Sequence, residues 1–235
     1  MAARWLAAGL ALLVCGGQAR AAVELGVGAD ASLDLPDRAL PQDYAAFGAA
    51  PSLRLPLRWS SASGVGLRAT ARLTRATGWD TVVWQEAGGT LTYVSTDHQA
   101  DLLAGELTLG PELRVGASRG AKIQPYLGAE AGALWAHVAH HFSGAAADSL
   151  TGGDESKVLT SSQLRPTAGA HGGIRWSPTA RFALELEAGY NVSFLNEVAL
   201  KGTAGVREAT VAELGLNAVR LGAGATFSLG DGKPR

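Results

Sequence analysis

The stretch "FALELEAGYNVSF" (residues 182–194) alternates between apolar and polar or small side chains. Its apolar set is Phe182, Leu184, Leu186, Ala188, Tyr190, Val192 and Phe194. A period of two predicts a β-strand with two unlike faces. The alternation alone leaves open which face is enclosed. Whether Glu185 and Glu187 point at water or into the interior therefore decides what kind of protein this is.

Seven further segments share this period, so the sequence predicts eight strands in one domain. The strands are expected at 22–35, about 50–60, 64–76, 101–117, 122–138, 163–176, 182–194 and about 213–229. The last of them changes parity near Asn217, which indicates a bulge. Glycine, at 31 of 235 residues, suits turns and close β packing. No apolar run after residue 22 approaches the roughly 18 residues of a membrane-spanning helix.

The connections between these strands alternate in length. Short turns are expected at "SSASG" (60–64), "SRGA" (118–121) and "SPTA" (177–180). Long connections are expected at about 36–49, 77–100, 139–162 and 195–212. Short turns on one side and long loops on the other are typical of a transmembrane β-barrel. Residues 81–96 predict a protruding hairpin, because its arms are shorter than the roughly 9–11 residues of a membrane strand.

Residues 1–21 have the composition of a secretory signal peptide, which leaves residues 22–235 as the barrel. Arg4 precedes the apolar run "WLAAGLALLV" (5–14), and "ARA" (19–21) is a cleavage pattern. Cleavage removes Cys15, the only cysteine; a lipid-modified Cys15 is the alternative. The chain has 20 basic and 21 acidic residues, and losing Arg4 and Arg20 makes the net charge about −3. This balance does not favour nucleic acid as a partner.

The polar faces of the predicted strands carry arginine and glutamate but almost no lysine. The main alternative to a membrane barrel is a soluble barrel with its polar face in water, and such a face would use lysine freely. Arginine suits enclosed ion pairs better, because its planar fork matches a carboxylate. We therefore expect an inward-facing lumen charge network. Its members are Glu24, Asp30, Arg54, Arg58, Arg68, Arg72, Glu106, Glu112, Arg114, Glu130, His171, Arg175, Glu185, Glu187 and Arg220.

The charges on these faces nearly cancel, as an enclosed set must. By strand, the dominant sign runs acid, base, base, acid, acid, base, acid, base, so nearly every strand has an opposite charge on a neighbour. An unpaired enclosed charge costs several kcal/mol. For Glu185, the expected partners are Arg175 and Arg220 on the two flanking strands.

Large aromatic residues on the apolar faces gather at the strand ends. The expected membrane-interface aromatics are Trp59, Trp79, Trp135, Trp176, Phe182, Phe194 and Phe227. Two belts of this kind match the two interfaces of a bilayer. A soluble barrel would more often place such side chains at its centre. We therefore expect Glu185 and Glu187 to face inward, and Leu184, Leu186 and Tyr190 to face lipid.

From Ala22 to about Leu229, the sequence resembles the small eight-stranded outer-membrane β-barrels, such as the OmpA transmembrane domain and OmpX. The resemblance rests on the leader, the eight alternating strands, the rhythm of turns and loops, and Phe227 near the end. It implies an antiparallel transmembrane barrel in a bacterial outer membrane, surrounded by lipid and lipopolysaccharide, with both termini in the periplasm. Family members commonly end on an aromatic residue, whereas "SLGDGKPR" follows Phe227 here.

The expected function is structural or interactive, exerted through the outer loops, with other envelope proteins as candidate partners. One alternative is a subunit of a larger envelope-spanning assembly. Another is a narrow pore, because glycines on the polar faces would leave a gap beside the charges. No enzyme and no cofactor is expected.

Two short patterns in the third long connection suggest other chemistry. His141, Ser143 and Glu155 resemble the His-x-Ser and Glu pattern of outer-membrane lipid A deacylases, which implies a lipid-modifying hydrolase as a further alternative. "HVAHHF" (137–142) with Asp148, Asp154 and Glu155 is the one candidate metal cluster. His140 and His141 diverge on a strand, so we expect a polar rim there and no metal.

Overall fold

A computed structural model describes residues 22–34, 49–61, 63–87, 90–115, 121–143, 158–193, 199–200, 209–210 and 218–229. The strands among them are β1 (Ala22–Asp34), β2 (Ala49–Ser60), β3 (Val65–Ala87), β4 (Thr90–Arg114), β5 (Ile123–Ser143), β6 (Val158–Trp176), β7 (Phe182–Ser193), β8 (Ala199–Leu200), β9 (Ala209–Thr210) and β10 (Ala218–Ser228). No helix in these ranges is long and apolar enough to cross a bilayer.

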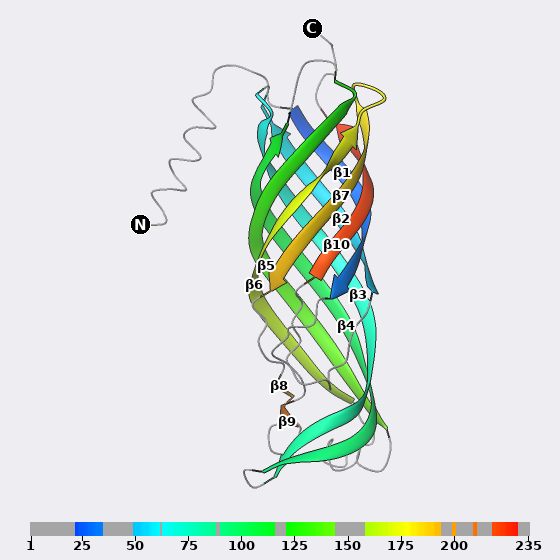
Figure 1. The fold of residues 1–235 in the computed structure, drawn as a ribbon. Coiled ribbons are helices and arrows are strands. Elements are labelled where there is room, and N and C mark those ends of the chain that lie inside the picture. The colour runs from blue at the N-terminus through cyan, green and yellow to red at the C-terminus, as the bar shows by residue number, and fades with distance from the viewer. Residues whose placement is uncertain are drawn as a thin grey trace, which may run out of the picture.

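Eight of the strands form a closed antiparallel barrel in the order β1-β10-β7-β6-β5-β4-β3-β2 (Figure 1). The first and last strands close it, in register from Glu24 opposite Ser228 to Asp34 opposite Ala218. The backbone N–H of Leu229 also donates to the carbonyl of Val23 at 2.8 Å. Closure pairs every edge strand, which is what a sheet surrounded by lipid requires. The predicted eight-stranded barrel is confirmed.

Two of the predicted short turns are held by local hydrogen bonds. At the β2–β3 turn, Gly64 has a φ of 85°, a left-handed conformation that glycine adopts without steric cost. Its N–H donates to the carbonyl of Ser61 at 3.1 Å. Before β7, the Thr179 hydroxyl accepts from the backbone N–H of Phe182 at 3.1 Å. These turns lie at the end of the barrel where β1 starts and β10 ends.

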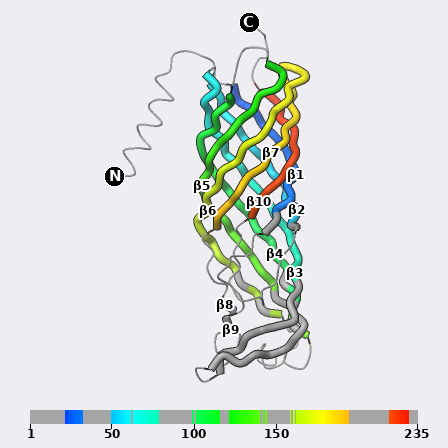
Figure 2. The backbone as a smooth tube through the Cα atoms, viewed as in Figure 1, coloured from blue at the N-terminus to red at the C-terminus, as the bar shows by residue number. Residues whose placement is uncertain are grey.

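The four central strands of the sequence are much longer than the others. β3 to β6 contain 23, 25, 21 and 19 residues, whereas β1, β2, β7 and β10 contain 11 to 13. They continue past the loop-side end of the other four as a one-sided wall (Figures 1 and 2). We call this part of β3–β6 the extended wall.

The protruding hairpin expected at 81–96 is the far end of this wall. β3 and β4 remain paired from Val65 opposite Leu113 to Ala87 opposite Thr90, with a register shift between Asp80 and Val82. The boundaries expected from the sequence, about 64–76 and 101–117, made both strands too short at their loop-side ends, which lie at Ala87 and Thr90. The reason is that the hairpin and the membrane strands form one continuous ladder.

The structure also contains a small sheet that the sequence did not predict. β8 and β9 pair with each other, and they contact β6 and β3 respectively. They belong to the fourth long connection and lie beside the extended wall (Figure 1). The leader and the bulge expected near Asn217 fall outside the described residues.

The barrel is apolar outside and charged inside. Leu107, Leu186 and Ile123 are 64%, 67% and 62% exposed on the outer face. Inside, the largest fully buried side chains include Arg54, Arg58 and Arg68. Water-soluble proteins place these residue types the other way round. The outer face therefore suits lipid. In a soluble barrel, the same apolar side chains would be exposed to water.

This closed ladder predicts a heat-dependent change in gel mobility. In lipid-like surroundings a broken backbone pair finds no replacement partner, so the folded barrel should resist dodecyl sulfate at room temperature and unfold only on boiling. Electrophoresis of boiled and unboiled refolded protein should show two different mobilities. Protein that was never refolded from urea serves as the control and should run like the boiled sample. One mobility for all three samples would contradict a closed barrel.

Candidate functional site: an enclosed charge network

All fifteen residues of the lumen charge network project into the barrel. The buried ones are Glu24, Asp30, Arg54, Arg58, Arg68, Arg72, Glu106, Glu112, Glu130, His171, Arg175 and Glu185. The side chains of Arg114, Glu187 and Arg220 are 12%, 7% and 13% exposed. Seven carboxylates thus meet seven guanidinium groups, with His171 beside them. The set is electrically neutral when His171 is neutral.

The network begins next to the short turns with a carboxylate held between two arginines. Glu24 accepts from Arg114 Nη2 at 2.6 Å. The same oxygen, Oε2, makes a short contact with Arg175 Nη1. The two arginines come from β4 and β6, neither of which pairs with β1. This end of the lumen is therefore closed by side chains that reach across it.

The next level is centred on Arg58. Its Nε donates to Glu112 at 2.9 Å and its Nη1 to Glu185 at 2.7 Å. The same guanidinium carbon lies 5.4 Å from the centre of the Tyr126 ring, in cation–π geometry. His171 Nε2 is 3.8 Å from Glu112 and closes this level.

Glu187 is the most heavily coordinated carboxylate near mid-barrel. Arg68 binds it with two nitrogens, at 2.5 Å and 3.0 Å, in the bidentate arrangement that is strongest for such pairs. Arg54 Nη1 makes a short ion pair with Oε1, the oxygen that also accepts from Arg68 Nη2. The Tyr126 hydroxyl donates to it at 2.8 Å. Four donor atoms, from three residues on three other strands, therefore converge on one side chain.

Toward the loops, two more carboxylates are shared between arginines. Asp30 contacts Arg54 Nε at 3.2 Å and Arg72 Nε at 3.1 Å. Glu106 accepts from Arg72 Nη1 at 2.5 Å and lies 3.0 Å from Arg220 Nη1. Most of these ion pairs join strands that are not neighbours, so the network ties the walls of the barrel together.

Glu130 is the most weakly paired acid of the network. The Thr108 hydroxyl donates to it at 2.9 Å, but its closest recorded guanidinium contact, to Arg72 Nη2, is 3.9 Å. It is as buried as the others. Glu130 therefore offers a matched comparison for the strongly paired acids.

The partners expected for Glu185 are wrong, although its position is inward as predicted. Arg175 lies directly opposite Glu185 in the β6–β7 register, yet its guanidinium reaches Glu24. Arg220 binds Glu106, and Glu185 binds Arg58 on β2. The expectation considered adjacent strands only. An arginine side chain is long enough to cross a narrow lumen, so adjacency does not determine the pairing.

Several uncharged members of the network were not identified from the sequence. They are Thr70, Thr108, Tyr126, Thr167, Asn191 and Thr226. Asn191, for example, makes a short hydrogen bond to Glu106 and a 3.0 Å bond to Thr167. Each of them occupies an inward position of its strand. The alternating positions that identified the inward-facing charged residues also include these residues with hydroxyl and amide groups.

At three inward glycines, a neighbouring polar side chain occupies the space where a Cβ would lie. A Cβ on Gly128 would lie 2.6 Å from the His171 ring, and one on Gly222 would overlap with Asp30 Oδ1. Gly173 lies in the same way against the Tyr126 ring. The sequence interpretation, that glycines leave a gap beside the charges, is therefore wrong at these positions. They are small because a buried polar side chain occupies the space next to them.

The expected membrane-interface aromatics fall on the outer face where the structure describes them. Trp59, Trp176 and Phe227 are 38%, 47% and 50% exposed near the short turns, and the Phe182 ring lies 5.3 Å from that of Phe227. On the loop side, Trp135 is 40% exposed. Phe194 and the side chain of Trp79 lie outside what the structure describes.

Above Trp135 the outer face becomes polar. The Trp135 ring stacks on His137, whose Nδ1 is 2.7 Å from the Ser162 hydroxyl. Asp101 accepts from Thr77 at 2.8 Å, and this hydrogen bond holds the pKa of Asp101 below its usual range. The apolar band thus ends at Trp135, and the extended wall beyond it has the outer face of a water-exposed structure.

The residues proposed for hydrolysis or metal binding are not assembled in the described structure. His141 Nε2 faces Asp101 at 3.3 Å. Glu155, Asp148 and Asp154 lie outside the described residues, and so does the side chain of His140. Among the side chains that are described, no group of three or more histidine, cysteine, aspartate or glutamate residues is placed to hold a metal ion.

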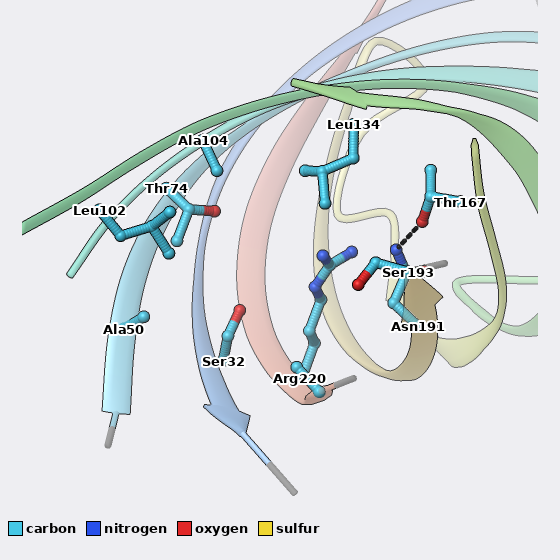
Figure 3. A pocket seen from close by; sticks show the side chains of 11 residues that line it. Ser32, Ala50, Thr74, Leu102, Ala104, Leu134, Thr167, Asn191, Ser193 and Arg220 are labelled. Atoms are coloured by element: carbon cyan, nitrogen blue, oxygen red, sulfur yellow. Dashed lines mark hydrogen bonds between the residues drawn. The ribbon is translucent and has the colours of Figure 1, made fainter. Parts of the chain in front are cut away.

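A recess opens at the loop side of the network (Figure 3), and we call it the mouth recess. Its empty volume, including the part open to solvent, is about 430 Å³. The polar residues that line it are Ser32, Thr74, Thr167, Asn191, Ser193 and Arg220. The apolar residues that line it are Ala50, Leu102, Ala104, Leu134 and Ala218. Arg220 and Asn191 join this recess to Glu106 beneath it.

The unequal pairing of the acids predicts unequal costs of neutralising them. Glu187→Gln should lower the free energy of unfolding by about 3–5 kcal/mol, because it leaves buried guanidinium groups without their carboxylate. The matched change Glu130→Gln should cost about 1 kcal/mol or less, since Glu130 mainly accepts a neutral hydroxyl. Urea unfolding in lipid vesicles, followed by tryptophan fluorescence, measures both. Equal costs would show that these ion pairs do not set stability.

No protein-family model matches the chain, and no curated protein matches it. It is similar in fold to solved outer-membrane proteins. For Neisserial surface protein A the identity is 14%, with 89% of this chain and 97% of that chain covered and a TM-score of 0.41.

Two further solved structures are similar at the same level. For Ail, the attachment invasion locus protein of Yersinia pestis, in complex with the heparin analogue sucrose octasulfate, the identity is 16%, the coverage 90% and 100%, and the TM-score 0.43. For a major outer membrane protein from Thermus thermophilus these values are 12%, 88% and 99%, and 0.47. These likenesses concern the fold alone. By its own strand order and its apolar exterior, the chain is a closed eight-stranded antiparallel transmembrane β-barrel, the architecture of the small outer-membrane barrels that its sequence resembles.

Proposed function

We propose that this protein is a non-enzymatic anchor in a bacterial outer membrane that presents the extended wall to partners outside the cell. The observation that carries the proposal is the contrast between β3–β6 and the other barrel strands. Four strands end near the apolar band, whereas the other four continue past it as one paired sheet. Building this wall requires ordering many residues that contribute nothing to membrane anchoring. A role of the wall as an interaction surface would account for this cost in conformational entropy.

The outer membrane is the compartment that this architecture fits. A closed β-barrel satisfies its backbone within lipid, and short turns on one side with long loops on the other are typical of outer-membrane barrels. The leader expected at residues 1–21 supports export. In this orientation the short turns and both termini lie in the periplasm, and the extended wall lies outside.

A pore is disfavoured by the contents of the lumen. Seven arginines and seven carboxylates bind one another across an eight-stranded barrel, whose interior is only wide enough for side chains. Passage of an ion would require several of these pairs to open in lipid-enclosed surroundings. The filled lumen therefore supports a role of the barrel as a rigid membrane anchor for the extended wall.

The polar outer face of the extended wall is the best candidate contact surface. Asp101, Gln99 and Thr77 form one hydrogen-bonded group on β3 and β4. His137 and Ser162 form another on β5 and β6. Lipopolysaccharide sugars and the loops of other envelope proteins both offer the donors and acceptors that such groups bind.

The orientation predicts selective labelling of introduced cysteines. Ser162→Cys, on the extended wall, should react with a membrane-impermeant maleimide on intact cells. Ser63→Cys, in the exposed β2–β3 turn, should react only after the cells are opened. Both positions are exposed, so accessibility to reagent is matched. Labelling of Ser63→Cys alone on intact cells would reverse the proposed orientation.

The contact surface is tested by photo-cross-linking in living cells. A photoreactive amino acid at Ser162 should give discrete adducts with an envelope protein or with lipopolysaccharide. The same amino acid at Leu186, on the lipid-facing surface, should give lipid adducts only, and at Ala180, in the β6–β7 turn, it should not give the Ser162 adduct. Identical adducts from all three positions would mean that the wall has no selective partner.

A further inference from the structure

The mouth recess has an uneven distribution of charge. Of the side chains that line it in the described structure, Arg220 alone is formally charged. Figure 3 shows this side chain extending into the recess from β10, with Ser32 on one side, Asn191 on the other and Leu134 facing it. The carboxylate beneath, Glu106, is not part of the lining. A molecule that enters the mouth recess therefore meets one positively charged side chain in a partly apolar lining.

Glu106 is shared between Arg220 and several other partners. It accepts from Arg72 Nη1 at 2.5 Å, from the Thr167 hydroxyl at 3.2 Å and from the Asn191 amide in a short hydrogen bond. Arg220 Nη1 lies 3.0 Å from the same carboxylate, but outside hydrogen-bond geometry. Glu106 therefore has Arg72 and two neutral donors besides its ion pair with Arg220, while Nε of Arg220 donates to no group among the described residues.

A second unmatched polar group lies directly beside Arg220. Ser32 and Arg220 are opposite each other in the β1–β10 register, and both face inward. Directly opposed residues of an antiparallel pair hold their side chains within contact distance. Ser32 is 4% exposed, and among the described residues its hydroxyl has no hydrogen-bond partner. Nε of Arg220 has none either. Buried polar groups are nearly always paired, so unmatched neighbours at a recess indicate a ligand position.

The side of the recess across from Arg220 is mostly apolar, with Thr74 as its one polar residue among those described. Leu102 and Leu134 are 3% and 5% exposed, and Ala50 and Ala104 complete this side. They belong to a buried apolar cluster that continues up the inner face of the extended wall to Val138. An aliphatic group placed here would leave water at little cost. The two walls together require a molecule with one charged end and one short apolar end.

We propose that the mouth recess binds a small monocarboxylate with a short aliphatic body. One carboxylate oxygen accepts from the guanidinium of Arg220 and the other from Arg220 or the Ser32 hydroxyl. The aliphatic carbons lie against Leu102 and Leu134. A planar carboxylate matches the arginine fork, and the ligand charge is opposite to the single charge of the lining. Part of the volume of about 430 Å³ is open to solvent, so the enclosed part of the recess suits a body of only a few carbon atoms.

The proposal is tested with [13C]butyrate and the full-length mature barrel in detergent micelles, followed by NMR titration. Butyrate should bind with saturable shifts, whereas butyramide and butylammonium, which have the same shape without the negative charge, should not. Arg220→Gln should weaken butyrate binding about tenfold or more, as loss of a charge-assisted hydrogen bond does. Arg220→Lys should restore part of the affinity, since it keeps the charge without the fork.

Two control variants separate the recess from general effects of the barrel. Arg114→Gln removes a lumen arginine of similar exposure at the opposite end, and it should leave butyrate affinity unchanged within about twofold. Leu134→Phe should fill the apolar side and weaken butyrate more than acetate. The change of gel mobility on boiling verifies that each variant is folded.

Three outcomes would overturn the assignment. The first is equal binding of butyrate and butyramide, which would mean that the charge of Arg220 is not used. The second is an equal loss of affinity in Arg220→Gln and Arg114→Gln. The third is the absence of any saturable shift in folded wild-type protein at butyrate concentrations up to roughly 50 mM, the range in which even weak sites fill.

Discussion

The structure depends on the enclosure of arginine–carboxylate pairs by a closed sheet. Lipid on the outside and a narrow lumen on the inside leave both groups without bulk water. Each charge must therefore find its partner within the protein, or it costs several kcal/mol. The hub at Glu187, with Arg68, Arg54 and Tyr126 around it, shows how fully this requirement is met. In a soluble protein the same position of the core would be filled by leucine and valine.

Pairing across the lumen makes this core stiff in a way that ordinary apolar packing is not. Arg58 on β2 holds Glu112 on β4 and Glu185 on β7 at once. Hydrogen bonds are directional, so each such link restricts both the distance and the orientation of the strands that it joins. The small residues at Gly128 and Gly222 belong to the same design, because they provide the space that His171 and Asp30 occupy.

The sequence predicts the barrel and its inside-out polarity well, and the pairing within it poorly. Alternation along 182–194 places Glu185 and Leu184 on opposite faces, since side-chain parity is a local property of a strand. The partner of Glu185 depends on which strands face each other across the lumen, and on how far each arginine bends. Neither is encoded within one strand. The sequence predicted the protruding hairpin, whereas the full length of the wall and the β8–β9 sheet depend on contacts between distant segments.

The mouth recess lies outside what the alternation predicts for a related reason. Arg220 was recognised as a lumen charge, but Ser32, Leu102 and Leu134 are ordinary residues in their own strands. They form a recess only because β1, β4, β5 and β10 come together around one axis.

The one-sided continuation of β3–β6 gives this molecule a direction within the plane of the membrane. A barrel whose strands all end at one height looks alike from every side, and neighbours approach it without preference. Here one half of the circumference rises above the other. A copy that rotates about its own axis in the bilayer thus presents a tall side and a low side in turn. Any assembly that engages the tall side would fix that rotation, so lateral order of many copies would follow from the shape of each one.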